Sequence, residues 1–121
     1  MDWKLELVSV PVSDVDRARD FYVDRAGFAL DHDHTVNENL RFVQLTPPGS
    51  ACSIAFGVGL TERSPGSAEC QLVVSDIDAA RAELGERGVE VSDVEEFGWG
   101  KFVFFSDLDG NRWAVQQLPP R

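Results

Sequence analysis

The chain has 121 residues, of which 43% are hydrophobic and 26% are charged, and this composition predicts one soluble globular domain with a modest core. Its 21 acidic and 11 basic residues give a formal net charge of −10, which disfavours binding to nucleic acids and to anionic membrane surfaces. The sequence has neither a run of about 18 apolar residues nor a signal-peptide pattern at its start, so we expect a cytoplasmic protein.

An internal repeat divides the chain. The segment Val12–Arg19 (VSDVDRAR) recurs as Val74–Arg81 (VSDIDAAR), and a glycine follows each copy, at Gly27 and Gly88. Such self-similarity indicates one supersecondary unit used twice. We therefore predict a single domain over 1–121, with module one at 1–58, a polar linker at 59–67 and module two at 68–121.

Each module is predicted to contain a strand, a helix and three further strands. Asp14 and Asp76 carry side-chain oxygens that can cap a helix start, and Gly27 and Gly88 suit the left-handed residue that ends a helix. Apolar residues recur near the helical period between these signals. In chain order, the expected elements are a strand ending at Val12, a helix over 14–26, strands over 28–35, 39–46 and 51–58, a strand ending at Val74, a helix over 76–87, and strands over 89–95, 100–106 and 111–117.

The doubled module resembles a known superfamily. VSDxDxAR at the end of each first strand and SDxDGNRW (Ser106–Trp113) before the last strand resemble the vicinal oxygen chelate group of glyoxalases, bleomycin resistance proteins and extradiol dioxygenases. The resemblance covers essentially the whole chain. It implies an α+β fold in which two βαβββ modules form an incomplete, cupped β-barrel around a ligand pocket. It also implies a divalent metal on the concave face in most members.

The residues at the metal-ligand positions do not suit a metal. By comparison with the family, these positions fall at Leu7, Ser53, Glu69 and Ala114. A divalent ion needs several oxygen or nitrogen donors to replace its hydration shell, and these four side chains do not supply them. We therefore expect no metal and no other cofactor.

Strand alternation predicts which side chains line the pocket. Trp99 lies in a loop with glycine on both sides, and it is predicted either to cover the pocket mouth or to contact a second chain. Phe102, Phe104 and Phe105 form an apolar run typical of a core or an interface, so they receive no site role. Besides Trp99, the predicted ligand-binding residues are Leu7, Ser9, Ser53, Glu69, Gln71, Arg112, Ala114 and Gln116.

Glu69 is the candidate for chemistry, if any residue is. It would contact a cationic or hydrogen-bonding ligand, or act as a general base, whereas the alternative is a structural carboxylate that is solvated or paired with Arg112. Cys52 and Cys70 are expected to be reduced core thiols. His32 and His34 share one face of a strand, a spacing that can bind metal, but their polar surroundings favour exposure to solvent.

These features favour a metal-independent small-molecule binding protein, similar to the bleomycin resistance proteins, that forms a homodimer and sequesters a cationic or polar organic ligand. The acidic charge would attract a cation, although it can also serve solubility alone. The alternative is an enzyme of the same superfamily, a lyase, isomerase or dioxygenase, that uses a metal held by other residues or acid-base catalysis by Glu69. A third interpretation is an accessory protein without a ligand. The sequence leaves open whether the barrel closes within one chain or between two.

Overall fold

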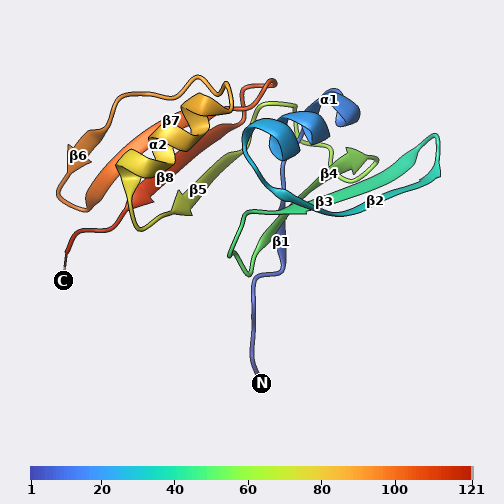
Figure 1. Ribbon diagram of the computed structural model, residues 1–121. Helices are drawn as coiled ribbons and strands as arrows, with labels where there is room; N and C mark the ends of the chain where they lie inside the picture. The colour runs from blue at the N-terminus through green and yellow to red at the C-terminus, as the bar shows by residue number, and fades with distance from the viewer. Residues whose placement is uncertain (121) are drawn as a thin grey trace.

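The computed structural model describes residues 1–120 and shows two four-stranded sheets, one in each module (Figure 1). Module one contains β1 (Leu7–Ser9), α1 (Val15–Asp20), the π-helical turn η1 (Phe21–Arg25), β2 (Ala29–Asn37), β3 (Leu40–Thr46) and β4 (Ser53–Val58). Module two contains β5 (Glu69–Val73), α2 (Ile77–Glu86), β6 (Glu95–Phe97), β7 (Gly100–Ser106) and β8 (Arg112–Gln117). Within residues 1–120, the helices are too short or too polar to cross a membrane.

The two sheets repeat one topology. Their strand orders are β1-β4-β3-β2 and β5-β8-β7-β6, and in each the first strand runs parallel to the last while the other pairs are antiparallel. The sheets stay open rather than closing into a barrel. The predicted α+β fold of two βαβββ modules is confirmed.

The caps of both helices lie where the repeat predicts them. Asp14 and Asp76 have an extended backbone, and their carboxylates accept hydrogen bonds from the N–H groups of Arg17 and Ala79. These bonds satisfy donors that have no partner within the helix. The sequence therefore defines both helix starts to within one residue.

The first helix was expected to be regular over 14–26, but it changes at Phe21 into the wider turn η1. There the N–H of Ala26 donates to the carbonyl of Phe21, a longer loop than in an α-helix. Phe21 and Tyr22 are both buried although they are adjacent in sequence. The wider turn lets two aromatic rings that are adjacent in sequence enter the same core. The helical period of apolar residues does not predict this arrangement.

The strand predicted over 89–95 is wrong, because only β6 (Glu95–Phe97) forms there. The N–H of Ser92 donates to the carbonyl of Phe104 at 3.0 Å, but the N–H of Phe104 donates to the Ser92 hydroxyl at 2.9 Å instead of to a carbonyl. The apolar alternation of this segment reflects burial, since Val89 is in the core and Val91 packs against it. Buried and exposed side chains alternate here although the backbone forms no regular ladder of hydrogen bonds.

One hydrophobic core spans both modules. The ring of Tyr22 lies 5.5 Å from that of Phe28 and 5.8 Å from the rings of Phe56 and Trp113, measured between centroids. Trp113 comes from module two and the other three from module one. Helix α1 contacts the sheet of module one and α2 that of module two (Figure 1). We call the side of each sheet that faces away from its helix the open face.

A buried hydrogen-bond network connects the modules at the level of this core. The Tyr22 hydroxyl donates to Asp107 Oδ2 at 2.7 Å and accepts from Trp113 Nε1 at 3.0 Å. Burial and the neighbouring Asp107 carboxylate raise the pKa of Tyr22, so its proton stays in place at neutral pH.

Asn111 extends the network to the segment after β1 and to the residue that follows the linker. Its Nδ2 donates to Asp107 Oδ2 at 2.7 Å and to the carbonyl of Pro11 at 2.8 Å. Its Oδ1 accepts from the N–H of Ala68 at 2.9 Å. One amide side chain thus connects the end of the first strand, the start of module two and the Asp107 carboxylate.

Replacing Tyr22 by Phe removes a donor to a buried carboxylate and an acceptor for a buried indole. We expect Tyr22→Phe to lower the free energy of unfolding by about 1–3 kcal/mol, because the partners lose hydrogen bonds that water does not replace. Urea unfolding followed by circular dichroism measures this value. Thr35→Val, at an exposed threonine of β2, is the control. A change in Tyr22→Phe as small as in the control would contradict the proposed role.

Candidate functional site

The register of the second sheet arranges the open-face side chains of module two in three rows. Residues directly opposite one another in neighbouring strands point to the same side, and alternate residues along a strand share a face. The Cα partners give the rows Val73–Gln116–Phe102, Gln71–Ala114–Phe104 and Glu69–Arg112–Ser106. The core residues Val103, Phe105, Trp113 and Val115 occupy the intervening positions and point the other way.

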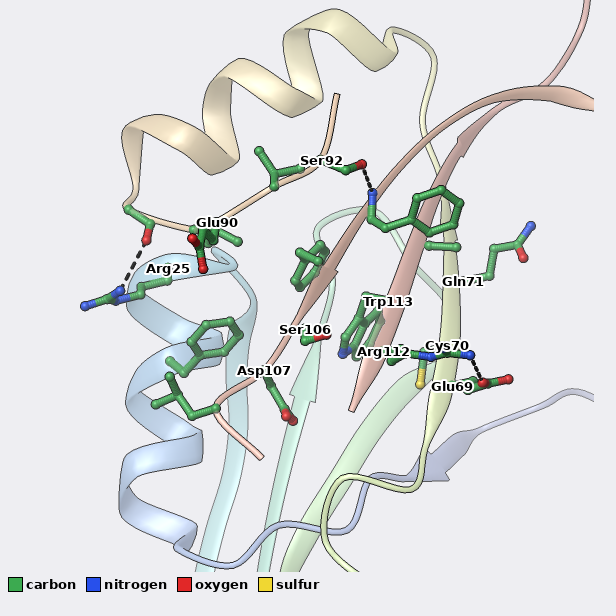
Figure 2. Close-up of a pocket in the computed structure, with 18 residues that line it drawn as sticks. Arg25, Glu69, Cys70, Gln71, Glu90, Ser92, Ser106, Asp107, Arg112 and Trp113 are labelled. Carbon is green, nitrogen blue, oxygen red and sulfur yellow. Dashed lines mark hydrogen bonds and ion pairs between the residues drawn. The ribbon is translucent and has the colours of Figure 1, made fainter. Parts of the chain in front are cut away.

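Two clefts border this surface. The larger, of about 1190 Å³, runs from the open face past β7 to η1, where Arg25 donates to the carbonyl of Gly88 (Figure 2). The smaller, of about 490 Å³, lies where β1 of module one approaches β5 of module two. Glu69 and Gln71 border both clefts, Arg112 and Ala114 border the larger, and Ser9 and Ser53 border the smaller.

The module-one positions implied for metal ligands offer little to an ion. Leu7 lies opposite Ser53 in the parallel ladder, and its side chain has no donor atom. The Ser53 hydroxyl lies 2.7 Å from that of Thr46 and accepts from Gln44 Nε2 at 3.3 Å. Since Thr46 donates its own proton to Asp31, Ser53 must donate to Thr46. The hydroxyl proton of Ser53 and one of its lone pairs are therefore used within its own sheet.

The module-two positions do not complete a metal site either. Glu69 forms an ion pair with Arg112, seen at one end of the larger cleft in Figure 2, and Ala114 lies two residues further along β8. Over residues 1–120, no three His, Cys, Asp or Glu side chains gather closely enough to hold an ion. The donor set does not fit the divalent metal that the fold implies, because a single carboxylate paired with a guanidinium is left to bind it.

Aromatic rings extend along the open face from Phe104, which borders the larger cleft, to Trp99, which does not. Phe97 stacks on Trp99 with centroids 5.2 Å apart and an interplanar angle of 10°, and it contacts Phe102 edge to face at 5.7 Å. Phe102 in turn stacks on Phe104 at 5.9 Å and 6°. The sequence alone predicts no site role for Phe102 and Phe104. Strand alternation within 100–106 was the missed signal, since it places Phe102 and Phe104 on the face opposite to Val103 and Phe105, although only Phe104 of the four is exposed.

A chain of two glutamines fixes the loop that carries Trp99. Gln71 Nε2 donates to Gln116 Oε1 at 2.6 Å, and Gln116 Nε2 donates to the carbonyl of Trp99 at 2.7 Å. Gly100 follows with φ of 143°, and a Cβ there would lie 2.6 Å from the carbonyl oxygen of Gln117. Glycine is therefore required for the close approach of this loop to β8. Hydrogen bonds thus connect the predicted residues Gln71, Gln116 and Trp99. Trp99 takes part through its backbone carbonyl and not through its indole.

The thiols and imidazoles do not form a reactive centre. Cys70 borders both clefts, and burial raises the pKa of its thiol, which keeps the nucleophilic thiolate scarce at neutral pH. Cys52 and Cys70 are free and partly buried. The His32 and His34 rings stack with centroids 5.7 Å apart, and both residues are exposed, as predicted.

The fold and this surface can be compared with known proteins. Residues 4–115 match the family model of the Glyoxalase/Bleomycin resistance protein/Dioxygenase superfamily. The chain belongs to this superfamily. It is a member in which the positions implied for metal binding carry Leu7, Ser53, Glu69 and Ala114.

Solved structures and a curated relative are similar to this glyoxalase-superfamily chain over nearly its full length. TnmS3, an antibiotic binding protein from Streptomyces sp. CB03234, is 37% identical, with 98% of each chain covered and a TM-score of 0.87. A glyoxalase/bleomycin resistance protein from the same organism is 38% identical, with 94% of this chain and 100% of that chain covered and a TM-score of 0.81. YetH, an uncharacterized protein of Bacillus subtilis strain 168, is 24% identical over 113 residues, which is 91% of this chain and 94% of its own.

The two consecutive glutamines of β8 allow a matched test of the loop geometry. Gln116→Leu removes the donor to the Trp99 carbonyl, so we expect amide hydrogen exchange at Gly98–Gly100 to accelerate about 2- to 12-fold, the equivalent of one hydrogen bond. Gln117→Leu is the control, because Gln117 Oε1 accepts from Ile77 N–H at the start of α2. Equal exchange rates at Gly98–Gly100 in the two variants would show that Gln116 does not hold the loop.

Proposed function

We propose that the chain is a metal-independent small-molecule binding protein that sequesters an organic ligand at the open face of module two. The observation that carries this proposal is the combination of exposed aromatic rings with polar side chains on one surface beside a cleft of about 1190 Å³. Ligand sites are concave, mostly apolar and provided with a few placed polar groups. The donor atoms of the implied metal positions, by contrast, are absent or already hydrogen-bonded.

The similarity to TnmS3 supports a binding function. That protein is an antibiotic binding protein, and it matches 98% of this chain at 37% identity. Sequestration needs a site that binds without transforming its ligand, and a surface of aromatic and amide groups suits that role. Acid-base catalysis by Glu69 gains no support, since Arg112 already donates to its carboxylate.

The charge of the ligand follows from two different features. The net charge of −10 disfavours anionic ligands and favours the approach of cations or of neutral polar molecules. Within the site, Glu69 is neutralised by Arg112, so it does not provide an unpaired charge for a cation. We therefore propose a cationic or polar organic ligand whose charge preference comes from the field of the whole protein.

We also propose that the protein is a homodimer, in the cytoplasm, in which a second copy covers the part of the open face around Val73 and Trp99 and leaves the larger cleft accessible. Val73 and Trp99 are 64% and 65% exposed there, which is unusual for large apolar side chains that share one surface. Light scattering is expected to give twice the chain mass of 13.4 kDa. A mass of one chain, at protein concentrations well above the Kd for the ligand, would contradict this part of the proposal.

Removal of metal by a chelator and a substitution that fills the larger cleft test the binding function. Calorimetric titration with a panel of aromatic and cationic antibiotics is expected to find a ligand whose Kd is unchanged, within about twofold, when a metal chelator is added. Ala114→Leu fills the larger cleft and should weaken binding at least tenfold, whereas Ala79→Leu on the exposed side of α2 should not. Loss of binding in chelator would contradict metal independence, and absence of binding across the panel would contradict the function itself.

A further inference from the structure

The ring of Phe104 has one covered face and one free face. Phe102 lies two residues earlier in β7, and the two rings stack with an interplanar angle of 6°. Phe102 therefore covers the side of the Phe104 ring that looks toward the start of the strand. The opposite side of the ring is directed at the next open-face position, Ser106, and 39% of Phe104 remains exposed.

The positions around this free face carry small side chains. Ser106 follows Phe104 along β7, and Ala114 lies opposite Phe104 in β8. Alternate residues along a strand are about 6.6 Å apart, and stacked rings have centroids about 4.5–7 Å apart, so a ring above Ser106 would stack on Phe104. Phe104, Ser106 and Ala114 all border the larger cleft. The cleft thus contains a flat wall with open space in front of it and small residues beneath.

Polar groups close the other sides of this space. Arg112 lies opposite Ser106 and is paired with Glu69, so this end of the site offers donors and acceptors without net charge. Gln71 lies beyond Ala114 and borders the cleft, and its Nε2 donates a hydrogen bond to Gln116. A ligand placed here would contact the Phe104 ring at one edge. At the other edge it would contact hydrogen-bonding groups that carry no net charge.

We propose that the ligand carries a flat aromatic ring system, which stacks on the free face of Phe104 above Ser106 and Ala114 and directs an uncharged polar group toward Arg112 and Gln71. This inference rests on the proposed binding function and specifies the chemical class of its ligand. A planar ring covers the whole face of Phe104, whereas a puckered saturated ring touches it at a few atoms. The contact between rings should favour the aromatic ligand by about 2- to 12-fold.

Two probes of matched size and polarity test the ligand class. Anthracene-9-carboxamide is flat, and its fully hydrogenated counterpart has the same carbon skeleton and the same neutral amide but puckered rings. In titrations followed by NMR, we expect the flat probe to bind about 2- to 12-fold more tightly. We also expect it to shift the Ala114 methyl signal upfield through its ring current. Equal affinities, or a flat probe that leaves the Ala114 methyl unshifted, would overturn the proposal.

Matched variants locate the contact. Phe104→Leu keeps apolar volume but removes the ring, and it should abolish the preference for the flat probe, while Phe97→Leu, on the same face outside the cleft, should retain it. Ser106→Leu fills the space in front of Phe104 without altering the aromatic cluster, and it should weaken the flat probe at least tenfold even if Phe104→Leu proves unstable. Tight binding of the flat probe to Ser106→Leu would overturn the proposal.

The outcomes separate this inference from the function on which it rests. If the saturated probe or non-aromatic antibiotics bind at the open face as tightly as flat ones, the binding function stands and the aromatic class is wrong. If neither probe nor any antibiotic of the panel binds, both proposals fail together.

Discussion

Burial of the Asp107 carboxylate is the constraint on which the arrangement of the two modules depends. The residue is 7% exposed, and a buried carboxylate costs several kcal/mol unless donors surround it. Its donors are the hydroxyl of Tyr22 from module one and, from module two, the backbone N–H of Asp109 and the side-chain amide and backbone N–H of Asn111. The modules cannot separate without leaving this carboxylate short of donors. The relative position of the sheets, and hence of both clefts, follows from that requirement.

Most of the fold could be predicted because its signals are local and occur twice. Asp14 and Asp76 cap the helices as expected, and the repeat alone implied two equivalent modules. The two errors have tertiary causes. The turn η1 forms because Phe21 and Tyr22 enter the same core, and no regular strand forms over 89–94 because Ser92 uses its hydroxyl in place of a carbonyl. Neither feature produces a periodic pattern in the sequence.

The face on which the candidate residues lie could be predicted, but their hydrogen-bond partners could not. Alternation placed Gln71 and Gln116 on one face correctly, since that rule needs only strand identity. It could not reveal that these glutamines bind each other and the Trp99 carbonyl, because such bonds depend on register between distant strands. Phe104 was overlooked for the opposite reason: an unbroken apolar run hides the alternation that separates rings on the open face from rings in the core.

The separation of the two sides of each sheet has a consequence for how such a protein can change. Phe104, Ser106 and Arg112 contact solvent on one side of β7 and β8, while the stabilising rings of Phe105 and Trp113 lie on the other. Substitutions at exposed positions usually alter stability by less than about 0.5 kcal/mol. Selection can therefore change the chemistry of this surface, one side chain at a time, at little risk to folding.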